Sequence, residues 1–290
     1  MCTGPTFAAS TCTRPETKGR ISGLAVRSLS ACLFVPTILL LVEGGAWSLL
    51  ILVLIVVGRG SWELFHMARQ AGRRPLAFLG TGLALSLSLC VHAAGTGYLI
   101  PAIAAAVLVI LAAALLRGTR DYIASALLTL GGTLYLGLLG SAPLLIMAAV
   151  GSDQHREARY LLIALFACIW LTDSAAYICG HLWGRKKLVP SISPGKTVVG
   201  FVSGIGGGLL PALGGAFLPS FTLAELLGLL LLASVGGQLG DLVESAIKRD
   251  LGVKDAPPLI PGHGGILDRF DSYLFAFPLA YLYILMFGIF

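Results

Sequence analysis

Long apolar runs recur along almost the whole 290-residue chain, and they constrain its fold more than any other feature. A helix needs about 20 apolar residues to cross a bilayer, and these runs have that length. The chain is 57% hydrophobic and 12% charged, whereas soluble domains average about 25% charged residues. We therefore expect an all-α, polytopic integral membrane protein with no separate soluble domain, because no polar stretch is long enough to enclose a core.

About nine transmembrane helices are predicted. We place them near residues 24–42, 46–65, 76–95, 98–116, 122–150, 160–180, 198–218, 222–243 and 271–290. The run 122–150 is long for one crossing and contains Pro143, so a tilted, kinked or broken helix and a pair of shorter helices are both open. Residues 1–23 are expected to form a mobile basic cytoplasmic tail rather than a cleaved signal peptide, and 24–120 the N-terminal transmembrane helices.

Lysine and arginine segregate between alternate connections. With nine spans, 18 of the 20 basic residues fall on one side of the membrane, and only Arg156 and Arg159 fall on the other. The positive-inside rule makes the richer side cytoplasmic. The N-terminus and the connection 244–270 are then cytoplasmic, and we expect a multi-pass protein of the cell (inner) membrane.

The connection 244–270 is the longest and the most charged. Six of the 14 acidic residues lie in it or beside it, namely Asp241, Glu244, Asp250, Asp255, Asp268 and Asp271. It also carries Lys248, Arg249, Lys254, His263 and Arg269. Charge this dense beside a bilayer is costly and indicates a functional site.

Helical spacing links the start of this connection to the preceding span. If the helix continues to Gly252, then Asp241, Glu244, Ser245 and Lys248 share one face. Two carboxylates and a cation at the membrane edge suit Mg²⁺ and a polyphosphate, because Mg²⁺ is usually held by one or two carboxylates and substrate phosphates. The alternative is a solvated helix end with an internal Glu244–Lys248 ion pair.

The end of the connection offers a second group of polar residues. His263 lies among glycines that allow close backbone approach to phosphate oxygens, so phosphate contact or general-acid help is expected, with a structural histidine as the alternative. Asp268 and Asp271 form a second carboxylate pair, although either could be a helix N-cap. Two carboxylate pairs around a basic loop are the expected layout of a metal-dependent phosphoryl or nucleotidyl site.

Two upstream features add to this site. Asp173 is an ionisable residue inside an apolar span, which is a functional hypothesis by default, with burial beside a partner such as a lysine as the alternative. Ser193, Lys196 and Thr197 offer hydroxyl and ammonium groups on a predicted cytoplasmic loop. Lys196 is either a phosphate ligand or a plain positive-inside anchor.

Together these residues resemble the signature of the CTP:phosphatidate cytidylyltransferase family, the CDP-diacylglycerol synthases. The similar segments are Ser245-x-x-Lys248-Arg249, Lys254-Asp255 and His263-Gly264-Gly265-x-x-Asp268-Arg269-x-Asp271, with Asp173-Ser174-Ala175-Ala176-Tyr177, Ser193-Pro194-Gly195-Lys196-Thr197 and Gly240-Asp241-Leu242-Val243-Glu244-Ser245 upstream. Pro257, Gly195 and Val199 depart from the usual family residues. The resemblance covers roughly residues 130–290, and the first hundred residues match only as generic spans.

The resemblance implies that the cytidylyl group of CTP is transferred to phosphatidate, giving CDP-diacylglycerol and pyrophosphate for phospholipid biosynthesis. Residues 121–290 are then the catalytic transmembrane region. The implied catalytic residues are Asp241, Lys248, Asp268 and Asp271, of which the three aspartates hold Mg²⁺. Substrate binding is implied for Ser193, Lys196, Thr197, Ser245, Arg249, Lys254, His263 and Arg269, and a supporting role for Asp173, Glu244 and Asp255.

The implied partners are CTP, phosphatidate and membrane lipid, and not nucleic acid. A monovalent cation such as K⁺ beside Mg²⁺, and a homodimer, are both compatible with the resemblance. Two other functions are weighed against it. One is a CTP-dependent lipid-alcohol kinase or cytidylyl transfer to another lipid phosphate. The other is an ion-coupled transporter, which the clustering of charge at one face rather than at the midplane disfavours.

Overall fold

The computed structural model describes residues 34–150, 155–253, 256 and 265–289. Within these residues eight helices are long and apolar enough to cross a membrane: Ala46–Gln70, Ala77–Ala94, Leu99–Leu116, Tyr122–Ala149, Arg156–Trp183, Val198–Phe217, Leu223–Asp250 and Leu267–Phe287. They match eight of the predicted spans, and the prediction of an all-α polytopic membrane protein is confirmed. A shorter apolar helix, Phe34–Glu43, covers the described part of the first predicted span. The predicted tail 1–23 lies outside the described residues.

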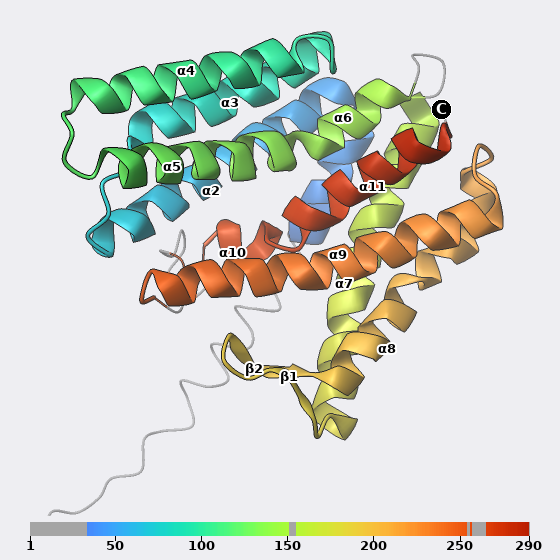
Figure 1. The fold of residues 1–290 in the computed structure, drawn as a ribbon. Coiled ribbons are helices and arrows are strands. Elements are labelled where there is room, and N and C mark those ends of the chain that lie inside the picture. The colour runs from blue at the N-terminus through green and yellow to red at the C-terminus, as the bar shows by residue number, and fades with distance from the viewer. Residues whose placement is uncertain (1–33, 151–154, 254–255, 257–264, 290) are drawn as a thin grey trace, which may run out of the picture. The chain divides into compact units, whose positions relative to one another are not determined.

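The N-terminal helices are α2 (Ala46–Gln70), α3 (Ala77–Ala94) and α4 (Leu99–Leu116). Helix α3 lies between α2 and α4 (Figure 1). On α4 only Ala106, Ile110 and Ala114 are buried, at helical spacing, so one narrow stripe packs against the protein. The rest of α4 exposes large apolar side chains, which is the arrangement expected of a helix that faces lipid.

The long run 122–150 forms one interrupted span. Helix α5 (Tyr122–Thr133) passes through a π-helical turn, η1 (Leu134–Leu138), and a 3-10 turn, η2 (Leu139–Ser141), into α6 (Ala142–Ala149). Pro143 stands in the first turn of α6, where its missing N–H breaks no helical hydrogen bond. Of the two alternatives that the sequence left open, the structure has the irregular single span and not the pair of shorter helices.

Helix α7 (His155–Trp183) and helix α8 (Val198–Gly208) run side by side and carry a small hairpin at one end (Figure 1). The hairpin pairs β1 (Lys187–Val189) with β2 (Ser193–Thr197) in antiparallel fashion. The sequence predicted only a loop here, because three to five residues of strand leave no clear alternating pattern. A 3-10 segment, η4 (Leu210–Phe217), completes the span after α8.

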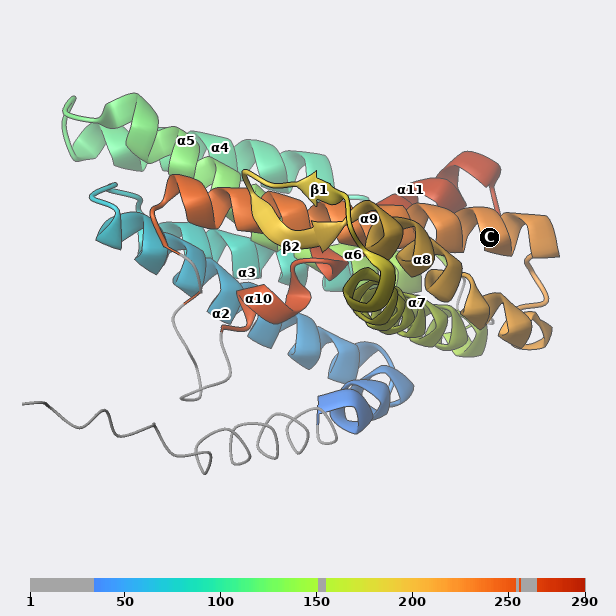
Figure 2. The ribbon, with the colours of Figure 1, turned by 90° about the horizontal axis from the view of Figure 1, so that it is seen from below.

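Helix α9 (Leu223–Asp250) crosses the molecule and packs along α11 (Tyr273–Phe287), which follows the short helix α10 (Leu267–Phe270). Their close contact depends on a stripe of small residues. At Gly240 a Cβ would lie 2.6 Å from the backbone oxygen of Asp271. Figure 2 shows the hairpin in front of α9 in the view from below, and the Lys196 side chain of β2 reaches the Gln238 carbonyl of α9. Because α9 continues to Asp250, the helix includes the first residues of the predicted loop 244–270.

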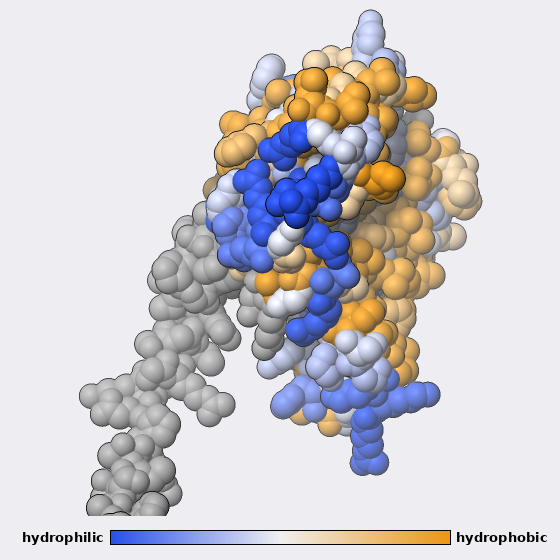
Figure 3. All heavy atoms as spheres, turned by 60° about the vertical axis from the view of Figure 1, so that its left-hand side comes forward, coloured by the Kyte–Doolittle hydropathy of each residue, from blue (hydrophilic) through white to orange (hydrophobic). Residues whose placement is uncertain are grey.

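Hydrophilic side chains gather toward one end of the helices. Figure 3 shows this face, with hydrophobic surface on its flanks. The connections α2–α3 and α4–α5 lie on this side in Figure 1, and they carry the exposed residues Arg73, Arg74, Arg117 and Arg120. The predicted grouping of basic connections therefore has a counterpart in the fold, while the membrane side to which it corresponds stays a prediction.

Candidate active site

Helix α9 is the frame of the site, and both of its ends are well determined by sequence. At its start Thr222 and Glu225 form a capping box, in which Thr222 Oγ1 accepts from the Glu225 amide and Glu225 accepts from the Thr222 amide. At its end Gly252 has φ of 71°, which favours glycine, and its amide bonds back to the Arg249 carbonyl. The last three turns of this helix carry five of the predicted site residues, Asp241, Glu244, Ser245, Lys248 and Arg249.

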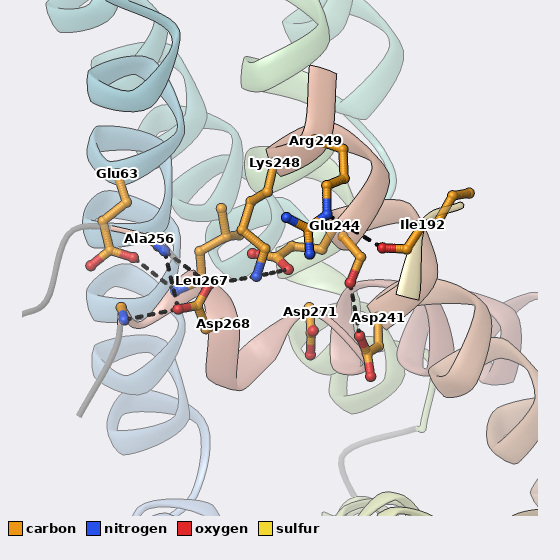
Figure 4. A network of polar contacts seen from close by, with 12 residues as sticks. Glu63, Ile192, Asp241, Glu244, Lys248, Arg249, Ala256, Leu267, Asp268 and Asp271 are labelled. Atoms are coloured by element: carbon orange, nitrogen blue, oxygen red, sulfur yellow. Dashed lines mark hydrogen bonds and ion pairs between the residues drawn. The ribbon is translucent and has the colours of Figure 1, made fainter. Parts of the chain in front are cut away.

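The first group of site residues is the buried triad, defined as Lys248, Glu244 and Asp268. Lys248 Nζ lies 2.5 Å from Glu244 Oε2 and 3.0 Å from Asp268 Oδ1. The Glu244 side chain is 1% exposed, Lys248 13% and Asp268 19%. The predicted i,i+4 pair on α9 is therefore present, and Lys248 also joins α9 to α10 (Figure 4).

Asp268 is further held by backbone amides. Its carboxylate accepts from the Ala256 amide at 3.2 Å and from the Gly265 amide at 3.2 Å. Ala256 and Gly265 flank residues 257–264, which include His263. Residues 257–264, and Lys254 and Asp255 before Ala256, lie outside the described residues. One carboxylate thus ties α9, α10 and both ends of this segment together.

The second group is the cavity pair, defined as Lys196 and Asp241. Lys196 Nζ lies 2.8 Å from Asp241 Oδ2, and the two side chains are 25% and 37% exposed. Ser245 Oγ donates to Asp241 Oδ1 at 3.3 Å, one turn along α9. Lys196 also donates to the Gln238 carbonyl at 3.3 Å. This pair joins the hairpin to α9 across 45 residues of chain.

The hairpin is held in place by its own local contacts. Thr197 caps α8 by accepting from the Gly200 amide at 3.1 Å, and its side chain is buried. Arg249 Nε donates to the Ile192 carbonyl at 3.4 Å, which ties the hairpin turn to the end of α9. Thr197 and Arg249 were both predicted to bind substrate, and in the structure both make contacts within the protein.

A cavity of about 610 Å³ opens between α7, the hairpin and α9. Its walls include the predicted residues Asp173, Ser193, Lys196, Thr197 and Asp241. Asp173 lies on α7, toward its C-terminal end. This helix brings Asp173 to the same cavity as Asp241 of α9, which is far from it in sequence. The cavity is large enough for phosphate groups with part of a nucleoside or a lipid headgroup.

Asp271 lies between the two groups. Asp271 stands near the start of the last span, beside Gly240 of α9. Its carboxylate accepts from the Ser272 amide at 2.6 Å. Figure 4 shows its side chain between those of Asp268 and Asp241. Within the described part of the chain, neither Asp271 nor Asp173 forms an ion pair with a basic side chain.

The donor set suits a hard divalent cation. Five carboxylates gather in this region (Asp173, Asp241, Glu244, Asp268 and Asp271), and two lysines contact three of them. Among the described residues no three His, Cys, Asp or Glu side chains stand close enough to form a ready metal-binding group. Carboxylates that lack a basic partner fit an ion held mainly by one or two of them together with substrate phosphates.

Glu63 of α2 belongs to this network and was not identified from sequence. Its side chain is fully buried, and it accepts from the amides of Ile266 and Leu267 at the start of α10. A signal was available, because Glu63 is an acidic residue within the predicted span 46–65. It was missed because the charge of this span was considered only for orientation.

Seven described residues of the predicted site do not line the cavity, namely Glu244, Ser245, Lys248, Asp268, Asp271, Arg249 and Arg269. Of these, Arg249 and Arg269 are exposed. The described part of the site is therefore made by α7, the hairpin, α9, α10 and the start of α11. It defines a multi-pass membrane protein with a carboxylate–lysine site toward the C-terminal ends of α7 and α9.

Comparison with known proteins agrees with this class. The profile of the Cytidylyltransferase family matches residues 25–287. A phosphatidate cytidylyltransferase of Staphylococcus aureus (strain COL) is 46% identical over 129 residues, covering 44% of this chain and 50% of the relative. One of Staphylococcus haemolyticus is 52% identical over 122 residues, covering 41% and 46%. One of Synechocystis is 36% identical over 284 residues, covering 90% and 96%.

The chain belongs to the cytidylyltransferase family. Its matches to the staphylococcal relatives span about half the length of those proteins, whereas the match to the Synechocystis relative spans nearly all of it. The family resemblance inferred from the motifs is confirmed, and it reaches into the first hundred residues, which the motifs alone had left as generic spans. Neither the kinase nor the transporter alternative is favoured by these relatives.

Proposed function

We propose that the protein transfers the cytidylyl group of CTP to phosphatidate, forming CDP-diacylglycerol and pyrophosphate for phospholipid biosynthesis. The observation that carries the proposal is the Lys196–Asp241 pair in a cavity of about 610 Å³, with the Lys248–Asp268 pair further along α9. The names of the staphylococcal and Synechocystis relatives support the choice of CTP and phosphatidate as donor and acceptor.

Phosphatidate supplies its own nucleophile. A phosphate monoester has a second pKa near about 6, so its oxygen is ionised at neutral pH. This oxygen forms a bond to the α-phosphorus of CTP, while the bond from that phosphorus to the α–β bridging oxygen breaks and pyrophosphate leaves with the electron pair. No general base is needed. The protein has to bring two anions together and stabilise the charge of the leaving group.

The residues divide this work between binding and positioning. Lys196 projects into the cavity and binds phosphate oxygens, with Ser193 and Ser245 adding hydroxyl donors. Lys248 contacts both Glu244 of α9 and Asp268 of α10 and so holds the two helices together. Further phosphate contacts are proposed for Arg249, Lys254, His263 and Arg269, Thr197 acts through its cap of α8, and Asp255 supports the loop.

Asp241, Asp268 and Asp271 are proposed to hold Mg²⁺, with Asp173 supporting them from α7. When bound, Mg²⁺ neutralises phosphate charge and stabilises the leaving pyrophosphate. Asp241 and Asp271 have more free acceptor capacity than Asp268, which already receives Lys248 and two backbone amides. A monovalent cation such as K⁺ is a further candidate for the same carboxylates.

The proposed location is the cell membrane, with the site on the cytoplasmic side, where CTP is available. Phosphatidate keeps its acyl chains in the bilayer while its phosphate reaches the cavity. The wall formed by α7 presents Tyr177, which is 75% exposed, so the lipid has an apolar approach beside the polar cavity. A site at helix ends meets both substrates without drawing CTP into the hydrocarbon region.

The test uses purified protein in detergent–phosphatidate micelles with CTP labelled either in the cytosine or at the γ-phosphate. Cytidylyl transfer places the cytosine label in the lipid fraction and releases the γ-label as pyrophosphate. A lipid kinase would give the opposite distribution. Replacing phosphatidate by another lipid phosphate identifies the acceptor, and cytosine label that stays wholly in the aqueous fraction overturns the proposal.

A further inference from the structure

Glu63 and the start of α10 form a contact between the two halves of the chain. The side chain of Glu63 is fully buried, with its oxygens 3.1 Å from the Ile266 amide and 2.9 Å from the Leu267 amide. Figure 4 shows Glu63 on α2 next to Asp268 and Leu267. The two donors are 203 and 204 residues away in sequence.

The charge of Glu63 is balanced on its own helix. A buried carboxylate is costly unless it is paired and hydrogen-bonded. Arg59, one turn earlier on α2, donates from Nε to Glu63 Oε1 at 2.9 Å, and its guanidinium lies 4.4 Å from the centre of the Trp62 ring. The acceptor is thus fixed in place by α2 itself, and only the two amides of the α10 turn depend on it.

Gly265 allows the close approach. A Cβ at this position would lie 2.5 Å from Glu63 Oε2 and 2.7 Å from Ala256 Cβ. Real Cβ atoms do not approach so closely, so any side chain here displaces the carboxylate or the turn. The predicted reason for this glycine was backbone approach to phosphate. The structure adds a second reason, which is contact with Glu63.

The amides of three successive residues are shared between two carboxylates. The Gly265 amide donates to Asp268, and the next two amides, of Ile266 and Leu267, donate to Glu63. Asp268 in turn meets Lys248. We propose that Glu63 is a positioning residue that holds the first turn of α10 and so sets where Asp268 stands against Lys248, an inference that rests on the proposed cytidylyl transfer.

Capping alone does not account for this contact. Helix α10 has four residues, and a helix so short gains little from a cap. The contact fixes the position of the turn that carries Asp268 relative to α2. By this inference the N-terminal helices contribute to the geometry of the site, although every predicted site residue lies C-terminal to them.

The first experiment compares Glu63→Gln with the wild type in detergent. Gln retains the shape but presents an NH₂ group to one of the two amides. We expect faster hydrogen–deuterium exchange in peptides covering 265–270 and unchanged exchange in α9. We also expect kcat lower by on the order of 10–100-fold with the KM for CTP within about twofold, because small misplacements mainly lower kcat. Glu43→Gln, which alters a more exposed carboxylate near Arg159, is the matched control and is expected to change neither.

The second experiment approaches the contact from α10. Gly265→Ala should raise exchange in the same peptides, and the double variant should lose less kcat than the two single losses combined, because both act through one contact. If Glu63→Gln is not recovered folded, Gly265→Ala carries the test. Wild-type exchange and kcat in both variants, or additive losses with a uniform rise in exchange, overturn the inference. Altered local exchange in a protein with no cytidylyl transfer would overturn only the proposed function.

Discussion

The buried triad and the cavity pair use the same chemistry in different surroundings. In the triad, Lys248 pairs with Glu244 and Asp268, and the three side chains are 1–19% exposed. Two backbone amides also donate hydrogen bonds to Asp268. In the cavity pair, Lys196 and Asp241 are 25% and 37% exposed and line a cavity. In the triad Lys248 is paired with both carboxylates, and among the described residues Glu244 Oε1 has no hydrogen-bond partner. The cavity pair is more exposed and keeps capacity for a ligand.

This difference separates framework from reaction site. A buried ion pair is expensive to break because the remaining charge stays desolvated, while a partly exposed pair contributes only about 0–1 kcal/mol to stability. The triad is therefore expected to affect folding and activity together. The cavity pair, with Asp271 beside it, is expected to affect activity with little effect on folding. Each prediction below tests that separation.

Removal of divalent metal is expected to have the largest effect. Excess EDTA should stop cytidylyl transfer, and added Mg²⁺ should restore it, since Asp173 and Asp271 form no ion pair among the described residues and Asp241 is partly exposed beside Lys196. The thermal midpoint in detergent should change little, because Lys248 balances the triad carboxylates without a metal. Undiminished turnover in EDTA would contradict a metal role for Asp241, Asp268 and Asp271.

Asp241→Asn should come next. Loss of the charge removes the proposed ligand and the partner of Lys196, and turnover is expected to fall by on the order of 10³-fold. The thermal midpoint should stay close to that of the wild type, because the side chain is partly exposed. Asp271→Asn is expected to behave alike. A variant that keeps full activity would show that its aspartate is not an essential ligand.

Helical spacing predicted the side-chain contacts of this site that lie within α9, and it predicted none of those between elements. The i,i+4 contacts Glu244–Lys248 and Asp241–Ser245 follow from the periodicity of α9, and both are present. The contacts Lys196–Asp241 and Lys248–Asp268 join different elements, so no spacing rule could give them. Glu63 could have been identified from the sequence as an acidic residue within a predicted span. Its partners could not, because they are backbone amides, which nearly every residue type carries.

The two lysines give the most direct test of the comparison. Lys248→Met leaves Glu244 buried without its charge partner, so we expect a loss of about 3–5 kcal/mol in unfolding free energy along with activity. Lys196→Met should cost less than about 1 kcal/mol while also lowering activity strongly. Thermal unfolding in detergent and lipid-label assays measure both. Equal stability losses in the two variants would remove the distinction between triad and cavity pair.

The smallest effect is expected at Thr197, which lines the cavity and also caps α8. Its hydroxyl was predicted to bind substrate, yet it caps α8 and is packed where a Cβ at Gly180 would lie 3.0 Å from Thr197 Oγ1. Thr197→Val should lower stability by about 0.5–2 kcal/mol through loss of the cap, with turnover reduced only as the hairpin loosens. Thr197→Ser keeps the hydroxyl and should restore both. If Thr197→Val instead raises the KM for CTP at unchanged thermal midpoint, the hydroxyl contacts the substrate. The substrate-binding residues would then include Thr197 of β2 beside the cavity pair.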